Sequence, residues 1–80
     1  MNVIEGYGIV LKKHRTEANL SQEKLALKCN LDRTFIGMLE RGERQPTIST
    51  LFSIAEKLNI SASNFIEEVE QLLENAAKDD

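Results

Sequence analysis

Apolar residues recur every three or four positions in five separate segments of this chain, which is the spacing of one face of an α-helix. The first segment, Val3 to Ala18, places Ile4, Tyr7 and Leu11 on such a face. The inward positions expected for the other four segments are Leu25, Ala26 and Cys29; Ile36 and Leu39; Ile48, Leu51, Phe52, Ala55 and Leu58; and Phe65, Ile66, Val69, Leu72, Leu73 and Ala76. Because no stretch alternates apolar and polar residues as a strand does, the pattern predicts an all-α protein of five helices.

Residues that begin and end helices occupy the short polar segments between these faces. Ser21 is expected to cap a helix that opens at Gln22, and Asn30 is expected to end it, since asparagine tolerates the left-handed backbone. The further expected caps are Asp32 for a helix from Arg33 to about Arg41, which Gly42 ends, Thr47 for the fourth helix, and Ser61 or Ser63 for the fifth. Gly6 and Gly8 each weaken the first helix by roughly 1 kcal/mol relative to alanine, so its start is expected to fray or come late.

The composition fits one small domain. With 80 residues there is room for a single core, and three Phe, one Tyr and no Trp make that core mainly aliphatic. The first residues lack the sustained apolar run of a signal peptide, and no window approaches a membrane-spanning length. We therefore expect a cytoplasmic protein with no membrane partner.

Few residues are placed for catalysis or metal binding. The single cysteine, Cys29, cannot form an intramolecular disulfide or a multi-cysteine zinc site, and its inward position indicates a small core side chain. His14 is the only histidine, and spacing fixes no acidic neighbour for it; Ser21 lacks a His/Asp companion pattern. We expect no enzymatic activity, no metal, no cofactor and no small-molecule effector.

The net charge of −3 is unevenly distributed along the chain. Residues 12–44 carry eight Lys and Arg against five Asp and Glu, whereas residues 45–80 carry two against seven. A protein that is acidic in total can still bind nucleic acid if its basic half forms one face.

Residues 22–41, QEKLALKCNLDRTFIGMLER, are the most informative segment. They predict two short helices joined by a tight turn, with a small Ala26 where the helices cross. This is the packing pattern of a helix-turn-helix, whose second helix enters the DNA major groove. A hairpin of helices in any small bundle has the same elements, so spacing alone leaves both interpretations open.

The same segment belongs to a longer run, LSQEKLA…NLDRTFIGMLERGERQPTISTLFSIAEKLNIS. Over about residues 9–65 this run resembles the phage-repressor (Cro-like) helix-turn-helix family, and LDRTFIG…ERGER is similar to the controller proteins of restriction–modification systems. Asn30 stands where the family has a turn glycine. The resemblance implies a compact lambda-repressor-like fold and a homodimeric transcriptional regulator that binds double-stranded DNA at a near-palindromic operator. The alternative is an antitoxin, or another interaction module of a toxin–antitoxin pair.

The third predicted helix presents Arg33, Thr34, Gly37 and Met38 on its outward face. Arg33 lies in the first turn, where its planar guanidinium can donate two bonds to guanine O6 and N7. Thr34 can bond a base edge or place its methyl group against thymine, and Gly37 would let the backbone approach closely. Phe35 either touches a thymine methyl or a sugar, or packs against the second helix. The expected phosphate contacts are Ser21, Gln22, Arg44 and Thr47.

The resemblance also implies an internal ion pair. Arg15 and Glu40 occupy positions that are paired in many relatives. We expect the pair to be largely buried and to lock the first helix to the third.

The helices of about residues 48–77 are expected to form a dimer interface as well as part of the fold. The fifth helix has a wide apolar stripe, and the fourth adds apolar side chains that need cover from the core or from a partner. The expected interface residues are Leu51, Phe52, Phe65, Val69 and Leu72. The other face of the last helix carries Glu67, Glu68, Glu70 and Glu74, which would repel DNA. A two-fold dimer would set its recognition helices roughly 34 Å apart, as successive major grooves require.

Overall fold

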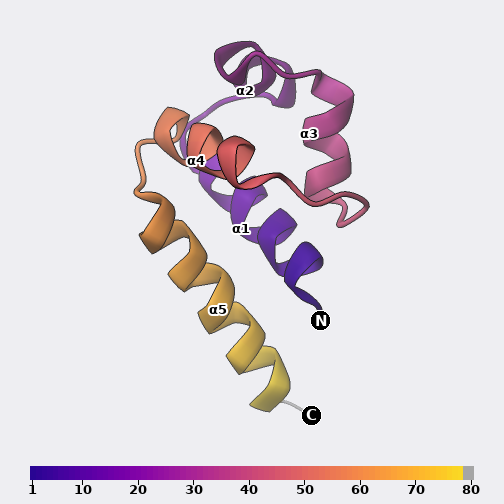
Figure 1. Ribbon diagram of the computed structural model, residues 1–80, viewed down its shortest axis with the longest axis vertical. Coiled ribbons are helices and arrows are strands. Elements are labelled where there is room, and N and C mark those ends of the chain that lie inside the picture. The colour runs from indigo at the N-terminus through magenta and orange to yellow at the C-terminus, as the bar shows by residue number, and fades with distance from the viewer. Residues whose placement is uncertain (79–80) are drawn as a thin grey trace.

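Five α-helices build the computed structural model, which describes residues 1–78 (Figure 1). They are α1 (Val3–Glu17), α2 (Gln22–Cys29), α3 (Arg33–Glu40), α4 (Ile48–Lys57) and α5 (Ala62–Lys78). α1 packs against both α3 and α5, and α2 packs against α3 and α4. α5 runs beside α1 and extends away from α2 and α3, so that the described C-terminal end lies near the N-terminus (Figure 1). The predicted all-α fold of five helices is confirmed.

Side-chain oxygens close most of the helix N-termini. Ser21 accepts a hydrogen bond from the backbone N–H of Lys24 at 3.1 Å, and Ser61, rather than Ser63, does the same for Asn64 at 3.1 Å. α1 begins with a reciprocal pair that the sequence analysis missed: Asn2 accepts from the N–H of Glu5, whose carboxylate accepts from the N–H of Asn2. Such a capping box stabilises a helix start by about 1 kcal/mol. The prediction that the start of α1 frays or comes late is therefore wrong, since the helix begins at Val3.

One closure is repeated at the C-termini of α1, α2 and α4. Asn19, Asn30 and Asn59 have φ of 59°, 56° and 58°, in the left-handed region. In each case the next residue donates its N–H to the carbonyl five positions back: Leu20 to Arg15, Leu31 to Ala26 and Ile60 to Ala55. These are Schellman closures, and the apolar residue after each asparagine packs against the core. The expectation that Asn30 ends the second helix is confirmed.

Gly8 sits where α1 meets the end of α3. A Cβ at this position would lie 2.8 Å from the carbonyl oxygen of Glu40 and closer still to that of Leu39. Any larger residue would therefore force the two helices apart. A glycine is therefore required here for the approach of α1 to α3, whatever its cost to an isolated helix.

The core is aliphatic apart from Tyr7 and Phe65, whose ring centroids lie 5.0 Å apart. The buried residues are Tyr7, Val10, Leu11, Leu25, Ala26, Ile36, Leu39, Ile54, Ala55, Leu58, Phe65 and Val69. On α4 the predicted inward face was partly wrong, because Ile48 is 72% and Phe52 59% exposed. The buried line of this helix runs instead through Ile54, one position from the expected stripe.

Candidate nucleic-acid interface

α3 presents polar side chains at its N-terminal end and is buried along its opposite side. Arg33 and Thr34 in the first turn are both exposed, whereas Ile36 and Leu39 are fully buried. Met38 is half-buried. The predicted base-contacting pair at the start of α3 is therefore free to meet a ligand that approaches along the helix.

Gly37 is not open to solvent, which corrects its predicted role as a place of free backbone approach. The position of a Cβ at Gly37 lies 3.0 Å from Nη1 of Arg41 and 3.7 Å from Oε1 of Gln22. These long side chains fold over the space that the missing Cβ leaves. Arg33, Gly37 and Arg41 are spaced four residues apart, so they form one line along α3. The sequence analysis missed Arg41, although this spacing was the signal that could have found it.

Phe35 packs against the core and remains partly exposed. Its exposed part lines a shallow surface hollow with Asn30, Leu31, Asp32 and Thr50. Of the two predicted roles, packing is therefore present in the free protein, and contact with a base edge stays a prediction.

A hydrogen-bonded network joins α1 and α2 to the end of α3. Nε of Arg15 donates to Oε2 of Glu40, and Nη2 donates to Oε1 at 3.0 Å. The Arg15 and Glu40 side chains are only 11% and 3% exposed. Gln22 donates its amide to the same carboxylate at 3.0 Å, and Arg15 also donates to the carbonyl of Leu20 at 2.8 Å. The hydrogen bond from Arg15 to Glu40 raises the pKa of the guanidinium, so Arg15 is charged at all ordinary pH values.

Residues predicted to contact phosphate flank α3 on both sides. Arg44 is exposed in the loop that follows the helix. Thr47 caps α4 and donates its hydroxyl proton to Thr50 at 3.0 Å, while Ser21 accepts a capping bond and keeps its own proton for another acceptor. Gln22 is the first residue of α2, where backbone N–H groups point out of the helix. Its side chain is already engaged by Glu40 in the free protein.

Comparison with known proteins identifies this arrangement. Residues 11–65 match the family described as Helix-turn-helix. The chain belongs to this family. It is a DNA-binding transcriptional regulator, and the family is one of regulators rather than enzymes.

Several relatives of this helix-turn-helix regulator are restriction–modification controller proteins. It is 45% identical over 56 residues to the control protein C.SmaI of Serratia marcescens, covering 70% of this chain and 67% of that protein. The structure of the controller protein C.AhdI from Aeromonas hydrophila aligns with a TM-score of 0.75 at 34% identity, over 78% of this chain and 94% of that one. The controller protein C.Esp1396I, solved as a tetramer in complex with its natural 35 base-pair operator, aligns with a TM-score of 0.79 at 38% identity, over 89% and 93% of the two chains.

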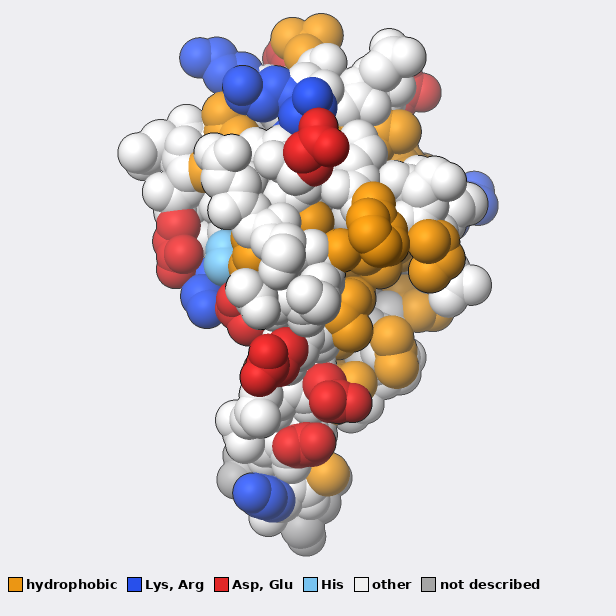
Figure 2. All heavy atoms as spheres, turned by 60° about the vertical axis from the view of Figure 1, so that its left-hand side comes forward, with side chains coloured by type: hydrophobic (Ala, Val, Ile, Leu, Met, Phe, Trp, Pro, Cys, Tyr) orange, Lys and Arg blue, Asp and Glu red, His pale blue; other side chains and the backbone are white. Residues whose placement is uncertain are grey.

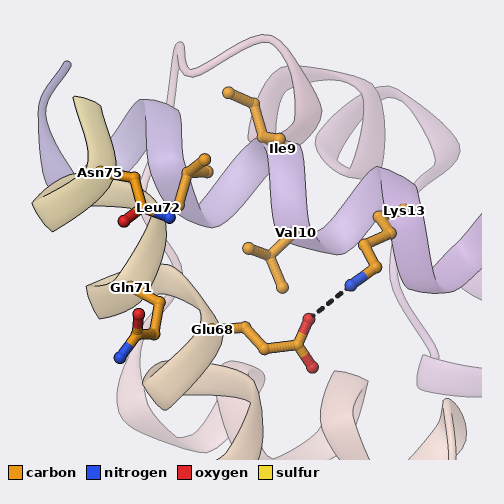
Figure 3. Close-up of a pocket in the computed structure, with 7 residues that line it drawn as sticks. All are labelled: Ile9, Val10, Lys13, Glu68, Gln71, Leu72 and Asn75. Atoms are coloured by element: carbon orange, nitrogen blue, oxygen red, sulfur yellow. Dashed lines mark hydrogen bonds and ion pairs between the residues drawn. The ribbon is translucent and has the colours of Figure 1, made fainter. Parts of the chain in front are cut away.

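The residues that were predicted to form the dimer interface of this helix-turn-helix regulator lie in three different places. Phe65 and Val69 are 1% and 3% exposed, because they pack against α1 in the chain's own core, and they are therefore not surface residues. Leu72 lines a groove between α1 and α5 with Ile9 and Val10, where Lys13 and Glu68 form an ion pair at 2.9 Å (Figure 3). Leu51 and Phe52 lie on another part of the surface, and Leu51, Phe52 and Leu72 are the predicted interface residues that a second chain could cover.

An exposed apolar face lies over α4, α5 and the start of α1. Ile48, Phe52, Ile66 and Val3 are 72%, 59%, 40% and 64% exposed. Leu51, Ile66 and Val3 also line a common cavity of about 120 Å³ with Pro46. Figure 2 shows hydrophobic side chains gathered in a patch on its right-hand side, with acidic side chains lower down. We call Val3, Ile48, Leu51, Phe52 and Ile66 the apolar face.

Charge separates the two ends of the molecule. Glu67, Glu70 and Glu74 are exposed on α5, which extends away from α3 (Figures 1 and 2). Arg33, Arg41 and Arg44 lie on or directly after α3. Attraction to a polyanion is therefore stronger at the end of the molecule that carries α3 than along the exposed side of α5.

The remaining candidate groups have structural partners. His14 is half-buried and its Nε2 lies 2.9 Å from Oε2 of Glu68, an acidic neighbour that spacing did not reveal. Cys29 packs against the core, and burial raises the pKa of its thiol. Within residues 1–78, no group of three His, Cys, Asp or Glu side chains is placed to hold a metal ion. Among the helices described, none has the length and apolar character needed to cross a membrane.

Proposed function

We propose that this chain is a restriction–modification controller-type regulator that binds a near-palindromic operator as a homodimer. The observation that carries the proposal is α3: Arg33 and Thr34 are exposed at its N-terminal end, while its C-terminal end is fixed by the buried Arg15–Glu40 pair. A helix held in this way can enter the major groove without losing its place on the domain. Because a regulator must share a compartment with the DNA that it controls, we also propose a cytoplasmic location.

Arg33 and Thr34 are proposed to read base edges. Arg33 would donate its two guanidinium bonds to one guanine, and Thr34 and Met38 would contact the neighbouring base pairs. Ser21 and Gln22 precede α3 in the chain, and Arg44 and Thr47 follow it. These groups are proposed to bind the phosphates that flank the groove, which would fix the helix in register.

The apolar face is proposed to be the dimer interface. Its large side chains are more exposed than the stability of an isolated chain favours, and a second copy with two-fold symmetry would cover them with the same residues. The controller protein C.Esp1396I was crystallised on its operator as a tetramer, which supports assembly of the present chain on DNA. In such a dimer the recognition helices would be spaced roughly 34 Å apart, to meet successive major grooves.

Sequence-specific DNA binding can be tested by selecting binding sites from random duplexes. The purified protein selects binding sequences from a random duplex pool, and affinities for the selected duplex and a scrambled duplex are then measured by gel shift. Arg33→Ala should cost about 1–3 kcal/mol per half-site on the selected duplex and relax the preference at one base pair. Lys57→Ala, at the end of α4, is the control that keeps full affinity. Unchanged affinity and selectivity in Arg33→Ala would contradict the assignment.

Dimerisation can be tested by sedimentation equilibrium at micromolar concentration. Phe52→Glu should convert the dimer to a monomer, since it puts a charge into the middle of the apolar face. Leu27→Glu is the matched control, because Leu27 is 74% exposed on α2, outside this face, and its substitution should leave the dimer intact. A wild-type protein that sediments as a monomer would refute the proposed homodimer.

A further inference from the structure

The side chain of Arg41 is folded back along the outer surface of α3. Its Nη1 lies 3.0 Å from the Cβ position of Gly37, and that position in turn lies 3.7 Å from Oε1 of Gln22. The guanidinium therefore covers the middle of the recognition helix, between the base-reading end at Arg33 and the first turn of α2. It is a cation on the surface that meets DNA in the proposed complex.

Glu43 already holds this cation in the free protein. Nε of Arg41 donates to Oε2 of Glu43 at 2.9 Å, and Nη2 donates to Oε1 at 3.2 Å. The pair is solvent-accessible, with the two side chains 57% and 53% exposed. A bidentate bond to two oxygens is also the way in which a guanidinium binds a phosphate. Glu43 thus occupies two of the donors with which Arg41 could bind the DNA backbone.

The backbone fixes Glu43 in this place. Gly42 has a φ of 72°, and the N–H of Glu43 donates to the carbonyl of Met38 at 2.9 Å, which is the closure that ends α3. The hydrogen bond from Arg41 also holds the pKa of the Glu43 carboxyl below its usual range. The carboxylate is therefore charged at neutral pH, as an ion pair with the guanidinium requires.

We propose that Glu43 occupies on Arg41 the site that a DNA backbone phosphate takes in the complex, and so limits the affinity for DNA. The proposal rests on the function proposed above and adds a residue that acts against binding. The exchange is feasible because an ion pair between solvent-exposed side chains contributes little to stability. In the complex the displaced carboxylate stays close to the phosphate and repels it. Glu43 therefore weakens binding to every sequence by a similar factor, which helps the protein to leave sites that α3 does not recognise.

The test is a double-mutant cycle of Arg41→Gln and Glu43→Gln, with affinities measured for the selected and the scrambled duplex over a range of salt concentrations. Glu43→Gln should tighten binding to both duplexes by a similar factor, roughly two- to fivefold per protomer. It should also steepen the plot of log affinity against log salt by up to about one unit per protomer. Arg41→Gln should weaken binding, and the gain in affinity from Glu43→Gln should be clearly smaller in its presence, because only the direct repulsion between the Glu43 carboxylate and the phosphate then remains. Glu56→Gln removes another ion-paired surface carboxylate, beside Lys57 on α4, and controls for the change in net charge.

Three results would overturn the inference. The first is an affinity for DNA and a salt slope that Glu43→Gln leaves unchanged. The second is an increase in affinity from Glu43→Gln that is equal with and without Arg41. The third is the same increase in affinity in Glu56→Gln. An increase in affinity for the selected duplex alone would indicate that Arg41 contacts a base, and would refute the phosphate contact. Wild-type protein that binds no duplex would refute both this inference and the proposed function. If wild type binds and Arg33→Ala does not, but Glu43→Gln has no effect, only the inference fails.

Discussion

Replacing Glu40 with glutamine should severely destabilise the domain, although the two side chains have the same shape. The substitution keeps an oxygen that can accept from Gln22 but leaves the charge of Arg15 uncompensated in a place where that side chain is only 11% exposed. Removing one partner of a buried ion pair typically costs about 3–5 kcal/mol. A domain of this size has a total stability of roughly 4–12 kcal/mol, so we expect a loss of about one quarter of it or more. The midpoint of thermal unfolding should fall by about 12–40 °C.

The assay is urea unfolding followed by circular dichroism, at one fixed protein concentration so that association does not vary between variants. Glu43→Gln is the matched control, since it makes the same chemical change in an exposed ion pair and should leave stability almost unchanged. The double variant Arg15→Met with Glu40→Met should be more stable than either single variant, because no unpaired charge is left. A loss below about 1 kcal/mol in Glu40→Gln, close to that of an exposed pair, would show that this brace does not fix α3 as argued.

Three other substitutions test separate features. Gly8→Ala should cost about 3 kcal/mol or more in urea unfolding and impair DNA binding, because its Cβ would meet the carbonyl oxygens at the end of α3; wild-type stability would refute the close approach. Tyr7→Phe should keep or raise stability by up to about 1 kcal/mol, since the buried hydroxyl has no hydrogen-bond partner among residues 1–78; a clear loss would reveal a partner. The hydrogen bond from Lys13 lowers the pKa of the Glu68 carboxyl in the folded protein. The ionised Glu68 side chain therefore stabilises the fold fully above the pKa of glutamate in the unfolded chain, about 4.3, and this stabilisation is lost as pH falls through the lower pKa of the folded state. Glu68→Gln should therefore be less stable than wild type at neutral pH, the two should converge in acid, and a constant difference in thermal midpoints would contradict this.

Helix boundaries were predictable wherever the signal lies within a few residues of the boundary. Ser21 caps α2 and Asn30 ends it, as expected, because a capping bond spans three residues and a Schellman closure five. Asn2 and Glu5 carry a signal of the same kind at α1. It was overlooked because the glycines of the first helix were judged only by their cost to an isolated helix.

Contacts between segments far apart in the chain could not be predicted from the sequence. The need for Gly8 arises from backbone oxygens of α3, which lie far along the chain. The apolar stripe of α5 shows that Phe65 and Val69 must be covered, but not whether the cover comes from α1 or from another chain. Likewise, the outward position of Gly37 is a property of α3 alone, whereas its burial depends on where the long side chain of Arg41 folds.

The contact of Gly8 with the end of α3 has a consequence for the DNA. At this contact the backbone of α1 packs against the backbone of α3, which cannot change conformation as a side chain can. The buried Arg15–Glu40 ion pair also holds the two helices together. We therefore expect α3 to move with α1 as one rigid unit. In the proposed dimer, a mismatch between the spacing of the two recognition helices and that of the half-sites must therefore be absorbed by bending or twisting of the duplex. The energy of that deformation depends on the base pairs between the half-sites, which no side chain touches. Operators should consequently differ in affinity through the stiffness of their central sequence, even when both half-sites are identical.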